Sequence, residues 1–195
     1  MKAVIDAQSL KDLVEQTKRF VSKNFNNEMM RHIHIIVDAE MQEVRAEALD
    51  GHRFSVAHCK LLNGDESFEC FITPEIPKVT KYDITAEIEL DGDKVFVTVG
   101  DSIRGYRQPQ GKFYDMQQII KPTAEPAIKV GFNAKLLAEA LQSAKDHEST
   151  YNAVRVYVYN DKAPILVRSN EKDVVGVLPL HINGCKWERD AEVTE

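Results

Sequence analysis

The sequence has few cysteines and no long hydrophobic run. Three of its 195 residues are cysteine (Cys59, Cys70 and Cys185), and no two of them have CxxC spacing, which favours three reduced thiols in a reducing compartment. The apolar runs are only a few residues long, far short of the roughly 18 residues that suggest a transmembrane helix. The N-terminus also lacks the basic and then apolar pattern of a signal peptide. We therefore expect a cytoplasmic protein with no membrane partner.

An excess of positive charge is also missing. The 25 lysines and arginines are outnumbered by 31 aspartates and glutamates, so the formal net charge is −6. This excludes a protein that binds nucleic acid over its whole surface, but not a local basic face on an acidic body. With 43% hydrophobic and 29% charged residues, the composition is that of a globular protein rather than a disordered one. The length predicts one large domain or two small ones.

Motifs for nucleotide binding and catalysis are absent. There is no P-loop and no GxGxxG sequence. His32 and His34 alternate on an expected strand and His58 precedes Cys59, so we considered a metal site and a thiol nucleophile. The four-ligand spacing of a zinc site is missing, however. The sequence therefore predicts no catalytic residue, no metal and no cofactor.

Two segments have the periodicity of an amphipathic helix. In residues 9–24 the apolar side chains recur at steps of three and four, and Ser9 is the expected N-cap. Residues 133–146 repeat the pattern, with Asn133 as the expected N-cap. Each helix has one apolar face and needs an apolar surface to cover.

The rest of the chain predicts antiparallel strands, because β-branched and aromatic residues alternate with polar ones between turn signals. In residues 84–90, Ile84, Ala86, Ile88 and Leu90 are expected on the buried side, and a turn at residues 91–93 makes a hairpin with residues 94–99. We expect an α+β fold of about three β-α-β-β-β units, with antiparallel sheets and helices on one face. The expected strands are 2–6, 31–39, 43–48, 53–62, 67–73, 83–90, 94–100, 103–108, 127–132, 153–159, 164–169 and 174–182. The second unit has a stunted helix that contains Pro74 and Pro77.

Five short strings, in the correct order, resemble the bacterial DNA polymerase III beta subunits, the DNA sliding clamps. Residues 48–54 (ALDGHRF) resemble the Ala-Thr-Asp-Gly-His-Arg-Leu string of that family, and residues 112–122 (KFYDMQQIIKP) resemble a degraded form of the segment that closes its middle domain. Residues 131–137 (GFNAKLL), 163–166 (APIL) and 177–182 (VLPLHI) resemble strings of its last domain. The resemblance implies the DNA-clamp fold.

The chain is close to half the family's length. Residues 1–122 resemble the middle clamp domain and residues 123–182 resemble half of the C-terminal domain, while residues 183–195 form a C-terminal extension that contains Trp187. The resemblance implies a non-enzymatic processivity factor that encircles duplex DNA without reading its sequence and docks DNA polymerase or other proteins with clamp-binding motifs. Flexible cations on inward-facing helices would meet phosphates loosely. The expected DNA-facing residues are Lys11, Lys18, Arg19, Lys23, Lys135 and Lys145, of which the last two lie on a locally neutral helix.

The family's second function is the docking of partner peptides in an apolar groove between the middle and last domains. Carried over residue by residue, the resemblance places one wall in the string at 48–54, the closing segment at Pro122 and the other wall near the end of the chain. The expected groove residues are Leu49, Gly51, His52, Arg53, Phe54, Pro122, Leu178, Pro179, Leu180 and Ile182. For Arg53, an ordinary surface salt bridge and the recognition of a partner carboxylate or phosphate both stay open.

An alternative function is a clamp-like interaction module, of a kind that a mobile element could encode, that binds clamp partners without encircling DNA. It would need the groove but not the ring. A protein that encircles DNA is expected to be a homo-oligomer. Three units per chain would need four copies to match the family's ring of about twelve units, and a dimer is the simpler alternative. The half-domain also leaves sheet edges to pair with another chain.

Overall fold

The computed structural model describes residues 1–23, 28–116, 128, 130–144, 153–169 and 174–179. The chain divides into two units, unit 1 (residues 1–120) and unit 2 (residues 121–195). Each unit is described by itself. No helix among the described residues is both long enough and apolar enough to cross a membrane.

The first repeat of unit 1 begins with a strand that runs straight into a helix. Its elements are β1 (Lys2–Asp6), α1 (Ala7–Thr17), β2 (Ile33–Asp38), β3 (Glu43–Leu49) and β4 (Phe54–Asn63), with 3-10 turns at Lys18–Phe20 and Met29–Arg31. The N-cap of α1 is Asp6 and not Ser9 as predicted: the Asp6 carboxylate accepts a hydrogen bond from the Ser9 backbone N–H at 2.8 Å. The helix thus begins earlier than expected and ends at Thr17, where the 3-10 turn follows.

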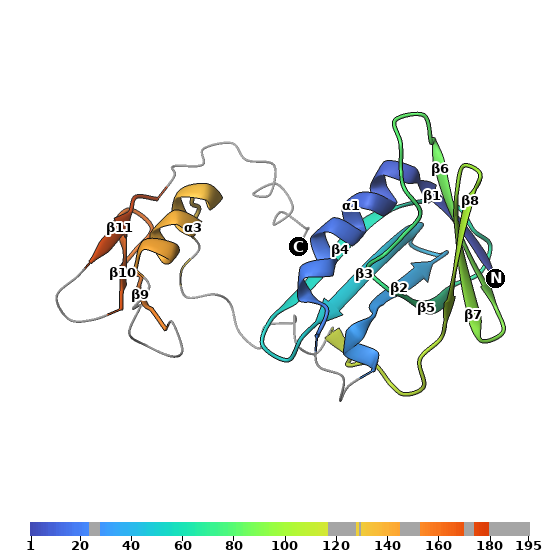
Figure 1. Ribbon diagram of the computed structural model, residues 1–195. Coiled ribbons are helices and arrows are strands. Elements are labelled where there is room, and N and C mark those ends of the chain that lie inside the picture. Colours follow the sequence, from blue (N-terminus) through green and yellow to red (C-terminus); the bar gives the residue numbers. More distant parts are fainter. Residues whose placement is uncertain (24–27, 117–127, 129, 145–152, 170–173, 180–195) are drawn as a thin grey trace, which may run out of the picture. The chain divides into compact units, whose positions relative to one another are not determined.

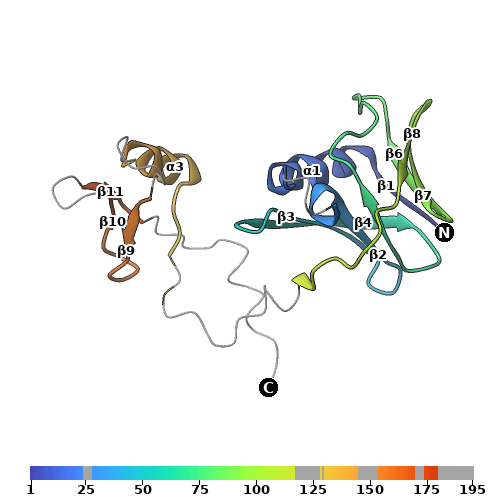
Figure 2. The ribbon, with the colours of Figure 1, turned by 60° about the horizontal axis from the view of Figure 1, so that its bottom comes forward.

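α1 covers one face of the sheet, lying along β3 and β4 (Figures 1 and 2). Its apolar stripe is the one predicted from the sequence and is buried in the core of unit 1. The buried residues of the helix are Ala7, Leu10, Leu13, Val14 and Thr17. The opposite face of α1 is exposed to solvent.

The second repeat of unit 1 has strands but no helix. It consists of β5 (Phe68–Ile72), β6 (Thr85–Asp91), β7 (Lys94–Val99) and β8 (Ser102–Arg107), and residues 73–84 have no helical turn. Ile84 was predicted on the buried side but is 79% exposed, because it precedes the first residue of β6. His32 was likewise predicted in a strand that begins at residue 31, but the observed strand β2 begins at Ile33, so His32 and His34 do not share a strand face.

The two repeats of unit 1 exchange their first strands. The strand order is β5-β2-β3-β4-β1-β6-β7-β8. β1 of the first repeat pairs with β6 of the second over five residue pairs, and β5 of the second pairs with β2 of the first over five. Each repeat therefore completes the sheet of the other, and their shared core makes unit 1 one folding unit.

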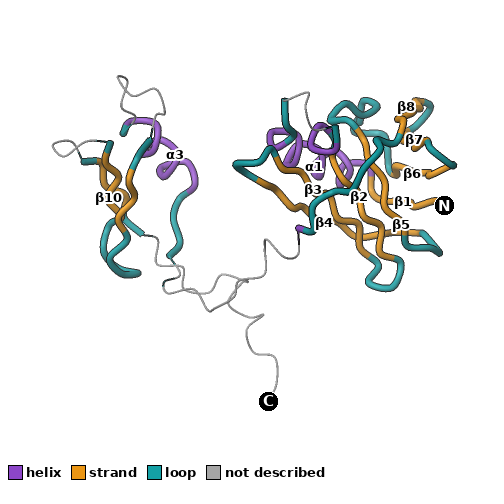
Figure 3. Tube along the Cα trace, turned by 90° about the horizontal axis from the view of Figure 1, so that it is seen from below, coloured by secondary structure: helices purple, strands orange, loops and turns teal. Residues whose placement is uncertain are grey.

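Unit 2 contains one repeat. α3 (Ala134–Ser143) is followed by β9 (Arg155–Tyr157), β10 (Ile165–Arg168) and β11 (Val175–Val177), in the sheet order β11-β10-β9 (Figure 1). Figure 3 shows α3 beside the strands of this sheet. Asn133 caps α3 as predicted, since its side chain accepts from the N–H groups of Lys135 (3.0 Å) and Leu136 (3.2 Å). The strand predicted at 127–132 is absent from its described residues, 128 and 130–132. The structure thus has the predicted α+β fold with antiparallel sheets.

Candidate functional site

The predicted docking residues 49–54 form the turn that joins β3 to β4. The Asp50 carboxylate accepts from the N–H groups of His52 (3.0 Å) and Arg53 (2.9 Å), and the Asp50 N–H donates to the Arg53 carbonyl at 3.1 Å. Gly51 has φ +89°, a conformation that a glycine adopts without strain. The Asp-Gly pair of the string therefore sets the shape of this turn, and it presents the Gly51 and His52 residues to solvent.

The Arg53 guanidinium is held by two parts of unit 1. Its Nη2 and Nε atoms donate to the Asp50 carboxylate at 2.7 and 3.0 Å, and Nη2 also donates to the backbone carbonyl of Arg19 at 3.0 Å. The guanidinium lies over the Phe20 ring, 5.3 Å from its centroid. The salt bridge left open by the sequence is thus present, and it lowers the pKa of Asp50 to about 2. The Arg53 side chain is still 59% exposed.

Leu49 does not form an open wall of this site. It is 7% exposed and packs in a small cluster with Met29, Phe113 and Met116. Phe113 belongs to the string that resembles the family's closing segment, and its described residues 112–116 border the sheet face opposite α1. Phe54, by contrast, is 45% exposed. Phe54 is therefore a large apolar side chain that is exposed beside this turn.

The other predicted groove residues belong to unit 2. Leu178 is 72% exposed and Pro179 is partly buried, directly after β11. Pro122, Leu180 and Ile182 lie outside the described residues. A groove that combines the two sets stays a prediction.

The predicted DNA-facing residues of the first repeat lie on or just after α1. Lys11, Arg19 and Lys23 are exposed, and Lys18 is half-buried with its ammonium 2.5 Å from the Glu15 carboxylate. The hydrogen bond from Lys18 lowers the pKa of Glu15, and the charges of Lys11 and Arg19 lower it further. The exposed surface formed by α1 and the residues just after it is therefore basic, although the Lys18 ammonium is paired with the Glu15 carboxylate.

The helix of unit 2, α3, carries fewer of the predicted DNA-facing residues. Lys135 lies in the first turn of α3, and its ammonium is 3.9 Å from the carboxylate of Glu139. Lys145 lies outside the described residues.

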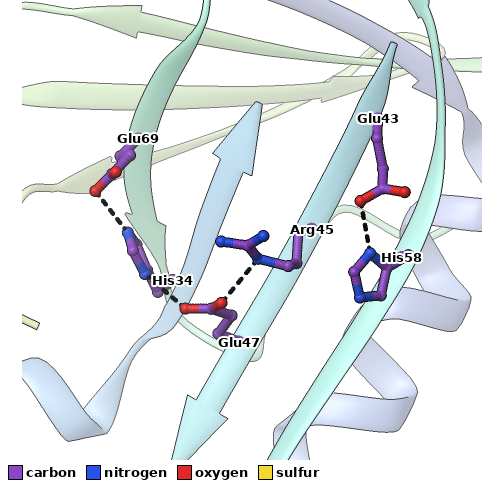
Figure 4. Close-up of polar contacts among 6 residues, drawn as sticks. All are labelled: His34, Glu43, Arg45, Glu47, His58 and Glu69. Carbon is purple, nitrogen blue, oxygen red and sulfur yellow. Dashed lines mark hydrogen bonds and ion pairs between the residues drawn. The ribbon is translucent and has the colours of Figure 1, made fainter. Parts of the chain in front are cut away.

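Sequence reasoning missed a polar cluster on the sheet face opposite α1 (Figure 4). His34, 5% exposed, has Nδ1 3.3 Å from a Glu47 oxygen and Nε2 3.1 Å from a Glu69 oxygen. Glu47 is 2% exposed and lies 2.8 Å from Arg45 Nε. The His34 ring stacks on Phe71, with the ring centroids 4.6 Å apart. The sequence indicated this cluster only through His34, a histidine within an apolar strand. A polar side chain that is buried in a strand needs a hydrogen-bond partner nearby.

The cluster borders an open depression of about 360 Å³ between the sheet and residues 111–116. Arg45 pairs with Glu47 and offsets the charge of one of the two carboxylates. The acids already have basic partners, and no group of three or more His, Cys, Asp and Glu among the described residues is arranged to hold a metal. The contacts are those of a structural network that joins β2, β3 and β5.

The thiols are poorly suited to nucleophilic catalysis. Burial raises the pKa of Cys59 to about 11 and that of Cys70 to about 12, so at neutral pH both are protonated and the reactive thiolate is scarce. His58 does not assist Cys59, because neighbouring strand residues point to opposite faces and His58 Nδ1 lies 2.7 Å from Glu43.

Among solved structures, the chain is similar to bacterial sliding clamps. The beta subunit of the DNA polymerase of Streptococcus pyogenes matches with a TM-score of 0.78 and 16% identity, over 92% of this chain and 50% of that one. The DNA polymerase sliding clamp of Bacillus subtilis matches with a TM-score of 0.75 and 19% identity (92% and 49%). The DNA polymerase III beta subunit of Thermotoga maritima gives 0.70 and 16% (92% and 50%).

The chain thus spans about half the length of these structures, and at such identities the likeness establishes the fold. A comparison with protein-family models found no match. A comparison with curated proteins found none either.

Proposed function

We propose that this chain, which has the fold of the bacterial sliding clamps, is a non-enzymatic clamp-like protein that encircles duplex DNA as a homo-oligomer and docks replication or repair proteins. The observation that carries the proposal is the pairing, within one clamp-fold unit, of an exposed basic helix face with the ALDGHRF turn. The two features are adjacent, since Arg53 of the turn donates to the carbonyl of Arg19 at the end of the helix region.

The DNA-binding part rests on the exposed face of α1. Lys11 lies on the exposed face of α1, and Arg19 lies in the 3-10 turn that follows the helix. The backbone therefore fixes where both side chains begin, while their charged ends can move. Such cations attract phosphates over several ångströms without recognising bases. An acidic body with a few local cations suits a protein that must slide, because it guides the duplex without gripping it.

The docking part rests on the β3–β4 turn. Phe54 is exposed, and Arg53 is held in place with part of its guanidinium open to solvent. A peptide with an apolar side chain beside an acidic or amide group would match this pair.

A second candidate is a docking module that does not encircle DNA. It is favoured by the second repeat of unit 1, whose residues 73–84 contain no helix, so that this repeat presents no counterpart of the basic face of α1 between β5 and β6. Such a module would bind the same peptides and leave DNA untouched.

Retention on DNA separates the two candidates. The protein is loaded onto nicked circular and linear duplexes, and its dissociation is followed at matched salt. A ring stays on the circle and slides off the linear ends. Equal dissociation from both forms would overturn encirclement and leave the docking module.

Docking is tested by titrating a short peptide with a glutamine and paired apolar residues. Phe54→Asp is expected to weaken binding at least tenfold, because it replaces an apolar contact with a desolvated charge. Tyr82→Asp is the matched control, since Tyr82 is a 79% exposed aromatic residue of the same unit. Unchanged binding by the Phe54 variant would remove the turn from the docking site.

A further inference from the structure

The single repeat of unit 2 has the same plan as the first repeat of unit 1. Four residues after the N-caps Asp6 and Asn133 come Leu10 and Leu137, and the next core positions, Leu13 and Ala140, follow after three more. Each helix packs on the last strand of its repeat, α1 on β4 and α3 on β11. Strand β9 of unit 2 therefore corresponds to β2 of unit 1.

In unit 1 the strand β2 has neighbours on both sides. β3 pairs with one edge, and β5 from the other repeat pairs with the second edge over five residue pairs. As a result Ile33 and Ile35, which point toward the core, are 0% exposed. The corresponding strand of unit 2 has one neighbour among the described strands, β10.

The exposure of β9 reflects this difference. Val156 pairs with Val167 of β10, which places both side chains on the same face of the sheet. Val167 is 0% exposed, whereas Val156 is 49% exposed, and Val158 on the same face is 45% exposed. α3 covers β11 and leaves the β9 end of this apolar face uncovered. A sheet edge with apolar side chains is a template for another strand.

The segment that precedes α3 has the sequence of a first strand. Ile128, Val130 and Phe132 alternate with Lys129 and Gly131, as buried residues alternate with others in β1. In unit 1 the strand β1 reaches α1 without a gap and pairs with the other repeat and with β4. Its counterpart in unit 2 has no second repeat among the described residues of that unit.

From these relations we propose that unit 2 is completed by unit 2 of a second copy of this chain. Residues 128–132 of each copy form a strand along the free edge of β9 in its partner, and the exchange is reciprocal. The product would be a two-fold symmetric domain with the same strand exchange that unit 1 makes between its own repeats.

A second copy fits this edge better than another part of the same chain. The first strands of unit 1 are already used, β1 on β6 and β5 on β2. The chain's own residues 128–132 are directed to the other edge, since β1 lies beside β4 and the counterpart of β4 is β11. β10 separates β11 from β9. The proposed dimer does not require a ring around DNA. A dimer that dissociates equally fast from circular and linear DNA would therefore agree with this proposal and would overturn encirclement.

The mass of the full-length chain in solution tests the proposal. Sedimentation is expected to give at least twice the 22.1 kDa of one chain. Val156→Asp places an unpaired carboxylate at the proposed contact, and we expect it to raise the dimer dissociation constant at least about 100-fold. Ile103→Asp is the matched control, because Ile103 is a 68% exposed apolar residue on the edge strand β8 of unit 1; it is expected to leave the mass unchanged.

A second measurement identifies the contact without a variant. Two differently labelled batches of the chain are mixed, and NMR detects proximities only between labels. Proximities between residues 128–132 of one copy and β9 of the other are expected. A monomeric wild-type chain, a dimer that only Ile103→Asp disrupts, or contacts of β9 confined to one chain would each overturn the proposal.

Discussion

Arg53 and Arg19 are 34 residues apart in the sequence, yet the Arg53 guanidinium donates to the Arg19 carbonyl at 3.0 Å. The same guanidinium binds Asp50 within its own turn. One side chain thus fixes the candidate docking turn to the end of the candidate DNA-facing helix region. A change at Arg53 should therefore alter both the turn and its attachment.

The Asp50–Arg53 pair predicts a contribution to stability that depends on pH. The pKa of Asp50 in the folded chain is about 2, below its ordinary value of 3.8, so the pair stabilises the fold above pH 4 and loses this effect as the pH falls from about 4 to 2. Arg53→Ala should remove the effect, which for an exposed pair is about 1 kcal/mol or less. Urea unfolding of both proteins at pH 5 and pH 2.5 measures it. A difference between the proteins that is larger at pH 2.5 would contradict the assignment.

The basic face of α1 predicts a specific salt dependence of DNA binding. Each cation that contacts a phosphate contributes about 0.9 to the slope of log affinity against log salt. Lys11→Glu with Arg19→Glu should reduce the slope by about 2. The control is Lys60→Glu with Lys94→Glu, which changes the net charge equally on exposed strand residues away from α1. A control that reduces the slope as much as the helix pair would show that overall charge and not α1 binds the duplex.

Glu47 and Glu69 both contact His34 but should contribute different amounts to the free energy of unfolding. Glu47→Ala leaves Arg45 and His34 without their buried partner, and we expect a loss of about 3 kcal/mol in the free energy of unfolding. The Glu69 side chain is 65% exposed, so Glu69→Ala should cost about 1 kcal/mol or less. Urea unfolding followed by far-UV circular dichroism compares the two. Equal losses would be inconsistent with a buried network centred on Glu47.

Substitution of Gln108 should lower the free energy of unfolding slightly and speed up hydrogen exchange at the Phe71 amide. Its amide accepts from the Phe71 N–H at 2.8 Å and donates to the Phe71 carbonyl at 2.9 Å, so it takes the place of a strand partner at the outer edge of β5. Gln108→Leu removes both bonds and should cost about 1–3 kcal/mol. Hydrogen exchange at the Phe71 amide should speed up. Gln108→Glu keeps the acceptor alone and should be intermediate; unchanged exchange in the leucine variant would rule out this role.

The thiols should be slow to react in the folded chain. With Cys185→Ser as the background, Cys70 should stay unmodified by a thiol reagent at pH 8, because its pKa of about 12 and its 0% exposure both oppose reaction. Cys59 should react slowly and faster as the pH rises toward 11. Mass spectrometry of the modified peptides separates the two. Rapid labelling of Cys70 without denaturant would contradict its burial.

The parts of the fold that were predictable from sequence are those with a local cause. The apolar stripe of α1 and the Asn133 cap follow from spacing within a few residues. The boundary at Asp6 was missed because a short strand and a helix share that residue, and period-based reasoning assigns ends poorly. Ile84 was misplaced because it precedes the strand pairing that would have buried it.

The candidate site was predictable only in part, because its key contacts are distant in sequence. The ALDGHRF string indicates a tight turn, but nothing in it shows that Arg53 reaches Arg19 or that Leu49 is covered by Phe113. The His34 cluster needs three strands to be placed in register before its members meet. The exchange of first strands in unit 1 is likewise a property of the sheet and not of any one repeat.

That exchange also constrains how the chain folds as it is synthesised. β1 pairs with β6, and the Met1 ammonium donates to the Leu90 carbonyl 89 residues away. At translation rates of about 5–20 residues per second, β6 follows β1 after a delay on the order of 5 to 20 s, whereas the other neighbour of β1, the strand β4, is synthesised earlier. Pairing over such a separation is slow to form. One edge of β1 is therefore without its partner while the second repeat is still being synthesised.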